Sequence, residues 1–440
     1  MGKAQLILRI LLVALWIRVT FEYVAQMIAP AIKPAFPLVA LAFDTVVVLL
    51  GCWTIRHRRD IIIAALFIAA TFFSTIIVNG YGLEMYFNGM RDFIGYIFVI
   101  PILRYFIDDD DLRDNFTHTV DRHLLIFLIA QAPCLITQYI RWGAGDTGGG
   151  TLGDNSGFIT TLIYLISFYL MQRRFDPERP WHSIRQHYYL ILLLLPTLLN
   201  ETKVSFVFMA MYILLLMPLG RKTFKRTLIA IPVALLAIYA GAVAFVSITA
   251  GVMGDVDDIF SLDYYMEGYL MSADSDDTER LVKWLIEEDD EANVAAGLVP
   301  DVPRITKMQV LPDLLDDNTR WAFGRGVGHF KGGTMIAGSD FYIENQWVLV
   351  GSIPYIYHLL IQLGGMGVAL MTLFFVVNMG MKPREGLRRQ HNLQLYLLGL
   401  ILIIQLYQDT LRNAYICLFI YYVMMMAWLP AEPQEEEADR

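Results

Sequence analysis

The sequence predicts an all-α protein that crosses a membrane about twelve times, since its apolar runs of about 17–25 residues have the length of bilayer-spanning helices. Hydrophobic residues make up 56% of the 440 residues, which is more than the 45–50% typical of soluble domains. The mean hydropathy is +0.49. One large polar segment, residues 251–347, interrupts the apolar pattern late in the chain. We expect this segment to form a mostly helical loop between the ninth and tenth helices.

The predicted spans follow the apolar runs in order. They cover residues 5–27, 36–55, 60–79, 92–107, 122–140, 157–173, 187–201, 204–219, 227–250, 352–378, 393–410 and 414–429. The seventh and eighth spans are short, and only Asn200 to Lys203 separates them, which suggests a tight hairpin. The predicted domains are spans one to nine (1–250), the loop domain (251–347), spans ten to twelve (348–430) and an acidic tail (431–440).

Lysine and arginine gather in alternate short loops, which indicates the orientation of the chain. The basic loops lie at 56–59, 113–122, 173–185, 221–226 and 382–389. The other short loops carry only isolated cations. Both termini and the acidic tail are therefore predicted to be cytoplasmic, with the large loop on the opposite face. The simplest setting is a bacterial inner membrane with this loop in the periplasm. The first run contains Arg9 and Arg18 and lacks a cleavage site, so it is predicted to remain as the first helix.

Composition excludes several classes of function. The formal net charge is −9, and no basic stripe of the kind that binds nucleic acid is present. Cys52, Cys134 and Cys417 all lie in apolar runs, so the sequence contains neither a disulfide framework nor a zinc spacing. The acidic clusters of the large loop lack the spacing of a calcium-binding EF-hand. No metal site is predicted.

Five cations on the outer face are candidate ligands of an anionic lipid headgroup or a diphosphate, which they would bind through charge-assisted hydrogen bonds. They are Lys203, Arg280, Arg91, Arg320 and Arg325. The alternative for each arginine is a pair with a nearby carboxylate. Lys203 lies between two short spans, and an ionisable group at such depth is usually functional.

Two residues are candidate acid/base groups, Glu344 and His358. Glu344, beside Asn345, is placed at the predicted membrane edge, where a partly desolvated carboxylate is a better general base. The alternative is an interfacial glutamate that reaches water. His358 lies inside an apolar run, where the alternative is a hydrogen bond to a neighbouring helix. His329, on the large loop, is a further candidate base.

The glycines at Gly324, Gly326 and Gly328 do not form a nucleotide-binding motif, because no strand precedes them and no helix clearly follows. We expect them to adopt positive φ angles, so that the loop bends sharply or lies flat over a ligand.

A second glycine-rich loop, residues 148–156, opens the sixth span on the outer face. Asp154 or Asn155 is expected to cap the N-terminus of that helix. A helix N-terminus at this place would also favour an anion.

Five local patterns, taken in chain order, carry a resemblance to a known family. They are Leu152 to Asn155 before a span, Glu201 to Lys203 at a helix start, Glu279 to Leu281 with Trp284, Gly326 to Gly328 with Phe330, and the pair Gly364 and Gly367. With the predicted topology, they resemble the bacterial superfamily of O-antigen ligases and O-antigen or exopolysaccharide polymerases. The sequence departs from the ligases' His-Asn pair, because the corresponding stretch is Ile343 to Asn345 and His358 falls later. This departure favours polymerase over ligase.

The resemblance implies a glycosyl transfer at the outer face. A glycan on undecaprenyl diphosphate is the donor, and a sugar hydroxyl of a second lipid-linked unit attacks the anomeric carbon with inversion. Arg280 and Lys203 would bind the leaving diphosphate, and Glu344 or His358 would accept the hydroxyl proton. Such enzymes need neither a metal nor another cofactor. The expected partners are the lipid bilayer, a chain-length regulator and a flippase.

Three alternatives remain beside the polymerase. A ligase would transfer finished glycan to lipid A core or another acceptor. A polyprenyl-phosphate-sugar glycosyltransferase would carry an acidic motif in the first outer loop, but residues 29–34 contain no carboxylate. A flippase or other transporter of lipid-linked glycans would have short loops, so the large loop argues against it.

Overall fold

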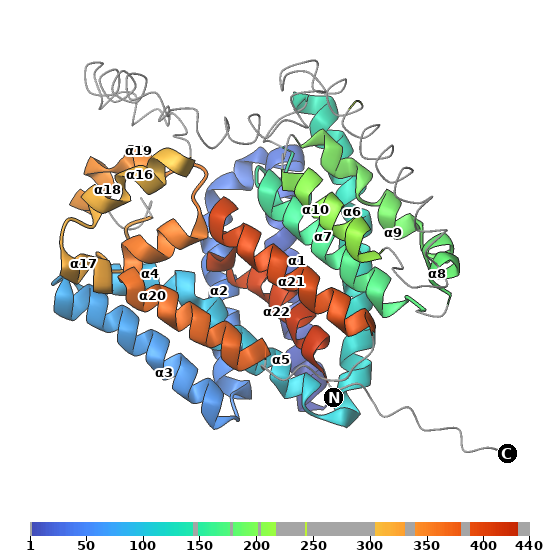
Figure 1. Ribbon diagram of the computed structural model, residues 1–440, viewed down its shortest axis with the longest axis horizontal. Helices are drawn as coiled ribbons and strands as arrows, with labels where there is room; N and C mark the ends of the chain where they lie inside the picture. The colour runs from blue at the N-terminus through green and yellow to red at the C-terminus, as the bar shows by residue number, and fades with distance from the viewer. Residues whose placement is uncertain are drawn as a thin grey trace.

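The computed structural model describes residues 2–143, 148–176, 179–200, 204–216, 243, 304–330, 339–379 and 388–429. Within these ranges the chain forms helices and turns without a strand (Figure 1), as the fold class predicts. Among the described residues, five helices are long and apolar enough to cross a membrane. They are Lys3–Ile28, Pro30–Thr54, Arg58–Val78, Asp110–Trp142 and Tyr355–Met379. The protein is therefore a helical membrane protein.

The helices carry the labels of Figure 1. The α-helices are α1 (Lys3–Tyr23), α2 (Phe36–Thr54), α3 (Arg58–Phe72), α4 (Leu83–Met90), α5 (Ile100–Ile107), α6 (Asp110–Trp142), α7 (Ser156–Arg173), α8 (Pro180–Gln186), α9 (Tyr189–Leu192), α10 (Val204–Leu216), α16 (Arg304–Leu314), α17 (Asn318–Phe323), α18 (Asp340–Glu344), α19 (Gln346–Leu349), α20 (Tyr355–Met379), α21 (Arg388–Tyr407) and α22 (Ala414–Trp428). The π and 3-10 segments are η1 (Val24–Ile28), η2 (Pro30–Ala35), η3 (Phe73–Val78), η4 (Arg91–Phe93), η5 (Gly95–Val99), η6 (Gly150–Leu152), η7 (Leu195–Leu199) and η8 (Thr410–Arg412).

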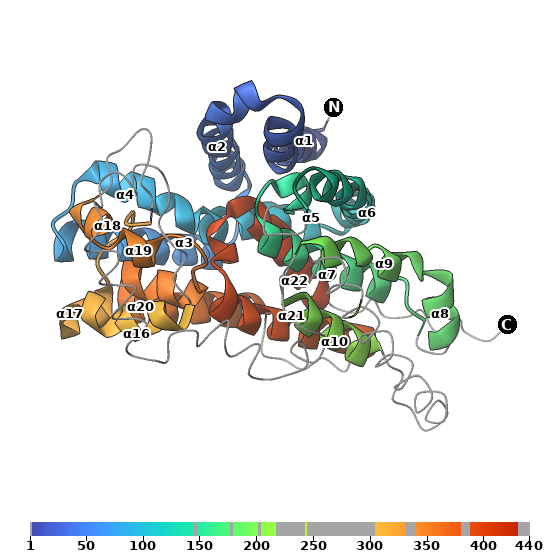
Figure 2. The same ribbon diagram turned by 90° about the horizontal axis from the view of Figure 1, so that it is seen from above.

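Two helices, α7 and α22, form the centre of the bundle. Every residue of α7 from Ser156 to Gln172 is buried, and α22 is buried along nearly all its length. A helix that is apolar on all sides belongs in a core. By contrast, α1 and α2 lie at one side of the molecule (Figure 2) and expose many large apolar side chains. Such faces suit contact with lipid.

The predicted spans correspond to described helices except for residues 227–250, which lie outside the described residues apart from Val243. The count of twelve and the sides of the membrane stay predictions. Three spans differ from expectation. The span predicted at 187–201 is not one helix but the short α9 followed by the 3-10 segment η7. The span predicted at 92–107 is not one α-helix but a succession of η4, η5 and α5. The span predicted at 122–140 is the C-terminal part of α6, which begins earlier because Asp110 and Asp111 suit its first turn.

The described part of the large loop is helical, in agreement with the prediction. Its first described helix is α16, and α17, α18 and α19 follow it. A second apolar cluster joins α16, α18 and α19 to the first turns of α20 through Leu315, Phe341 and Val348. The loop therefore packs on the bundle close to the start of α20. Residues 251–303 of the loop lie outside the described residues.

Candidate functional site

The glycines of the loop after α17 adopt the conformation that the sequence predicts. Gly324, Gly326 and Gly328 have φ angles of 70°, 92° and 108°, which residues with a Cβ rarely adopt. Gly364, inside α20, also has a positive φ of 60° with ψ at −152°, so the helix is broken there. The loop and the break lie against each other, since a Cβ on Gly364 would be 2.6 Å from the amide nitrogen of Gly324.

Hydrogen bonds explain why the loop lies at the break in α20. A broken helix leaves carbonyl groups without their intrahelical partners. The amide of Arg325 donates to the carbonyl of Ile361 at 2.7 Å, and the amide of Gly326 donates to that of Gln362 at 3.1 Å. The Ser74 hydroxyl, from η3, donates to the same Gln362 carbonyl at 3.1 Å. Irregular backbone is tolerated in a membrane bundle where protein groups satisfy it in this way.

Next to this break lies a group of polar side chains that we call the Asp92 cluster. Its members come from η4, α20 and the segment between α21 and α22, and they are Asp92, His358, Gln362, Asp409 and Arg412. The Gln362 side-chain amide donates to Asp92 Oδ2 at 3.1 Å. His358 Nε2 is 3.5 Å from the same oxygen. Arg412 Nε is 3.8 Å from Asp92 Oδ1, and Arg412 Nη1 is 2.5 Å from Asp409 Oδ2.

His358 and Gln362 are the most buried members of the Asp92 cluster, and His358 also lies among aromatic rings. It is fully buried, between the ring of Phe330 at 4.4 Å and that of Tyr355 at 5.9 Å. Its Nε2 faces Asp92 Oδ2 of η4, which is the contact with a neighbouring helical segment that the alternative expects. Its Nδ1 makes no hydrogen bond among the described residues. Buried polar groups almost always have a partner. A buried imidazole with spare hydrogen-bonding capacity beside a carboxylate is suited to acid/base chemistry.

Arg412 is the member of the cluster that reaches the surface. Its side chain is 20% exposed, whereas that of Asp92 is 3% exposed. The Arg412 side chain therefore lies between the buried Asp92 carboxylate and the surface. A guanidinium in such a place can exchange a carboxylate partner for a phosphate, because both offer the paired oxygens that its planar fork binds.

Three of the predicted diphosphate ligands have carboxylate partners in the structure, which is the expected alternative to a ligand role. Arg91 Nη2 is 2.8 Å from an oxygen of Asp44. Arg320 and Arg325 both pair with Asp316. The hydrogen bond from Arg320, together with the positive charges of Arg325 and Arg320, lowers the pKa of Asp316. None of the three joins the Asp92 cluster. Lys203 and Arg280 lie outside the described residues, and their predicted role stays a prediction.

His329 holds the loop together and is not positioned as a free base. It is fully buried, and its Nε2 donates to the carbonyl of Arg325 at 2.8 Å. Its Nδ1 therefore accepts from the Ser339 hydroxyl, also at 2.8 Å. Burial lowers the pKa of His329 to about 4, so the imidazole is neutral at pH 7. Both nitrogens are in use.

Glu344 differs from the expectation of a desolvated carboxylate. It ends α18 and is exposed, because this helix buries only Phe341. The neighbouring Asn345 uses its side-chain amide locally, as a donor to the carbonyl of Phe341 at 2.9 Å. Protein atoms therefore do not remove Glu344 from solvent. Its role as the base stays a prediction.

The prediction of a side-chain capping hydrogen bond at the start of α7 is wrong. Asn155 is at the N-cap position, but no side-chain cap bond forms there. Instead the Asn155 amide donates to Glu22 at 3.0 Å, and Asp154 accepts from Gln26 at 2.6 Å. These two hydrogen bonds connect the loop to the helical segment of Glu22 and Gln26. The Asn155 side chain does not cap α7.

The sequence prediction omitted Asp92, Gln362 and Asp409, and it noted Arg412 only as an isolated outer cation. One signal was available, since carboxylates at the ends of apolar runs are rare and often functional. No protein-family model matches this chain, and no curated protein matches it. The fold and the site thus define the class, a helical membrane protein with a buried acid/base cluster, and the function is inferred from that cluster.

Proposed function

We propose that the protein polymerises undecaprenyl-diphosphate-linked oligosaccharide units into O-antigen or exopolysaccharide at the outer face of the bacterial inner membrane. The observation that carries the proposal is the Asp92 cluster. In this cluster the Asp92 carboxylate lies 3.5 Å from Nε2 of the buried His358 and 3.8 Å from Nε of the partly exposed Arg412 side chain. A transfer from a lipid diphosphate needs these two functions, a proton acceptor and a cation for the leaving group.

In this mechanism His358 is the general base. Asp92 lies beside Nε2, so it favours the tautomer with the proton on that nitrogen and leaves Nδ1 as the acceptor. The acceptor hydroxyl attacks the anomeric carbon, its oxygen forms the new glycosidic bond, and its proton passes to Nδ1 of His358. The bond between the anomeric carbon and the diphosphate oxygen breaks, and the lipid diphosphate leaves as an anion.

The leaving diphosphate is the proposed ligand of Arg412. Its charge would compete with Asp409 for the guanidinium, and Lys203 and Arg280 are further predicted ligands. His358 is fully buried beneath Phe330, so the substrate reaches it when the glycine loop carrying Phe330 moves aside. The positive φ angles of Gly326 and Gly328 give that loop its sharp bends.

Replacing Arg412 with Gln and Asp92 with Asn, singly, tests the proposal in cells. The surface polysaccharide is separated on a gel, and lipid-linked intermediates are extracted and sized. Arg58→Gln is the matched control, because Arg58 is exposed at the start of α3 and far along the chain from the cluster. We expect both site variants to lose long polymer and to accumulate a single-repeat lipid-linked unit, while the control makes normal polymer.

Two other results would favour the alternatives. Long polymer that accumulates on the lipid carrier would indicate a ligase. Lipid-linked units that stay on the cytoplasmic face would indicate a flippase. Normal polymer in both site variants would contradict the assignment of the site.

A further inference from the structure

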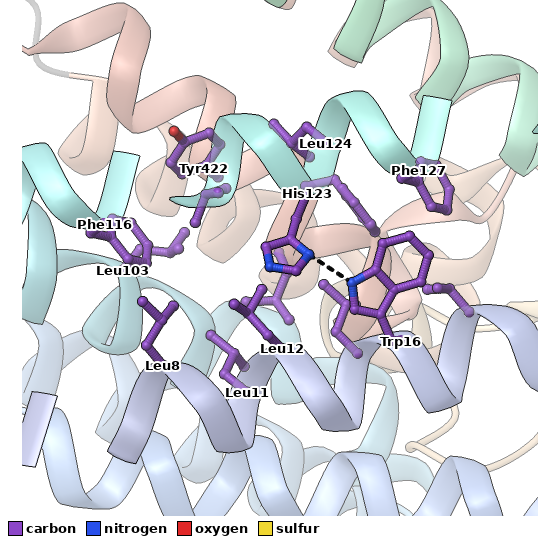
Figure 3. A pocket seen from close by; sticks show the side chains of 15 residues that line it. Leu8, Leu11, Leu12, Trp16, Leu103, Phe116, His123, Leu124, Phe127 and Tyr422 are labelled. Carbon is purple, nitrogen blue, oxygen red and sulfur yellow. Dashed lines mark hydrogen bonds between the residues drawn. The ribbon is translucent and has the colours of Figure 1, made fainter. Parts of the chain in front are cut away.

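The helix α1 has two different faces. On one of them Leu8 and Leu12 point toward α6 (Figure 3). The indole N–H of Trp16, on the same face, donates to Nδ1 of His123 of α6 at 2.9 Å. The cavity left between α1, α6 and α22 has a volume of about 50 Å³, whereas small-molecule sites have roughly 300–1,000 Å³. This face of α1 is therefore a packing contact.

The other face of α1 is an exposed apolar stripe with a cation at its end. Its members follow one another at spacings of three and four residues, so they share one side of the helix. They are Lys3, Leu6, Ile10, Val13 and Ile17, all exposed. In a membrane protein an exposed apolar stripe of this kind suits contact with lipid. Lys3 lies at the start of the helix, so its ammonium group extends to the level of the lipid headgroups.

A second cation joins Lys3 at this end of the molecule. The Lys3 Nζ lies 4.9 Å from the ring centre of Trp53, on α2, and 5.7 Å from that of Tyr105, on α5. The guanidinium carbon of Arg56, which follows α2, is 4.3 Å from the centre of the same Tyr105 ring. Two positive charges therefore lie over one aromatic ring. Like charges repel each other, so this arrangement favours an anion beside them.

Carboxylates of the protein do not supply that anion. Among the described residues, Lys3 and Arg56 make neither an ion pair nor a hydrogen bond. The carboxylates of the adjoining helix ends, Asp60 and Asp108, both pair with Arg104. The two cations are thus available for charge-assisted hydrogen bonds, the kind that phosphate accepts from lysine and arginine. Tryptophan and tyrosine beside them are typical of the level of the headgroups.

We propose that Lys3 and Arg56 bind the phosphate of one anionic phospholipid, whose acyl chains lie along the exposed stripe of α1. From Lys3 to Val13 the stripe is about 15 Å long at the rise of an α-helix, and half of the hydrocarbon core of a bilayer is about 15 Å. The lipid belongs to the leaflet that faces the N-terminus of α1. A zwitterionic lipid carries its own ammonium group, which the two cations repel, so a lipid of net negative charge binds more tightly. This site is independent of the proposed polymerase activity.

The test is lipid retention by the purified full-length protein. The protein is placed in detergent with equal amounts of phosphatidylglycerol and phosphatidylcholine, washed, and weighed by native mass spectrometry. We expect the wild type to keep one phosphatidylglycerol. Lys3→Gln and Arg56→Gln should each weaken this preference about fivefold, the effect of one cation near an anionic surface, and the double variant about 25-fold. Arg122→Gln is the matched control, because it removes an exposed arginine from α6, and it should keep the wild-type preference.

Photo-crosslinking tests the position of the acyl chains. With p-benzoylphenylalanine in place of Ile10, the protein should crosslink phosphatidylglycerol in preference to phosphatidylcholine, and Arg56→Gln should remove that preference. The same label in place of Leu38, which is 53% exposed at the other end of α2, should show no preference. All of these side chains are exposed, so the substitutions leave the packed core intact.

Three results would count against the proposal. Phosphatidylglycerol retention that Lys3→Gln and Arg56→Gln leave unchanged, or that Arg122→Gln weakens equally, would overturn the site. An equal preference for phosphatidylglycerol at the labels of Ile10 and Leu38 would overturn the position of the chains. A dimer of this protein that retains no lipid would overturn the assignment of the occupant.

Discussion

Replacing Gly364 with Ala tests whether the break in α20 holds the glycine loop in place. The new residue would have φ near 60° and ψ near −152°, a region that costs a residue with a Cβ about 1–3 kcal/mol. The added Cβ would also lie 2.6 Å from the amide nitrogen of Gly324 and from the carbonyl oxygen of Trp321. Overpacking of this kind costs about 1–3 kcal/mol more. The total expected loss is about 2–6 kcal/mol.

The next residue supplies the control. Gly365 has no positive φ, and the nearest atom to an added Cβ is 3.6 Å away. Gly365→Ala should therefore be neutral, or stabilising by about 0.5–1 kcal/mol, as for other helical glycines. The assay is thermal unfolding of both variants in detergent, followed by tryptophan fluorescence. Equal melting temperatures for the two variants would refute the role assigned to the break.

Three other predictions concern stability. His329 has a folded-state pKa of about 4, below the unfolded value of about 6.5, so between these values mainly the unfolded chain binds the proton. Acidification from pH 6.5 to pH 5 should lower the free energy of unfolding by about 1.6 kcal/mol, and His329→Gln should remove this dependence in melting curves. Arg104→Ala should lower the free energy of unfolding by about 3–5 kcal/mol, because it leaves the Asp60 carboxylate buried without its partner. If urea unfolding shows a smaller decrease for Arg104→Ala than for an exposed arginine replaced by alanine, the prediction is contradicted. Gln138→Leu should lower the free energy of unfolding by about 2–3 kcal/mol, because the Gln138 side-chain amide donates a hydrogen bond to the Gly150 carbonyl and accepts one from the Gly150 N–H. Unchanged hydrogen exchange of the backbone amides around η6 would contradict this prediction.

The long apolar helices and the glycine conformations could be predicted from the sequence. Apolar length alone identifies segments such as α3 and α20, and three glycines in alternate positions after α17 predict positive φ angles. The succession of 3-10, π and α turns from η4 to α5 could not be predicted from the apolar run; within it Gly95 packs closely against Cys417 of α22, which is far away in the sequence. The residues around Gly95 in the sequence do not indicate that contact.

The candidate site was predicted only in part, for a physical reason. His358 stands out as a histidine in an apolar run, but its partner Asp92 is 266 positions earlier in the chain. Arg412 joins the same cluster from a third segment. Such a cluster exists only after the helices pack, whereas the pairs of Arg320 and Arg325 with Asp316 are nearly local. Sequence spacing can indicate contacts between residues that are close in the chain, such as the pairs of Asp316. It does not indicate contacts between distant segments, such as those of the Asp92 cluster.

The central claim is that His358, rather than Glu344, is the base of a glycan polymerase. The most direct measurement is the polymerisation rate in membrane vesicles supplied with lipid-linked repeat units, for His358→Gln and Glu344→Gln at equal amounts of folded protein. We predict a loss of about 10²–10⁴-fold for His358→Gln and a rate near that of the wild type for Glu344→Gln. A full rate for His358→Gln together with an inactive Glu344→Gln would contradict the claim.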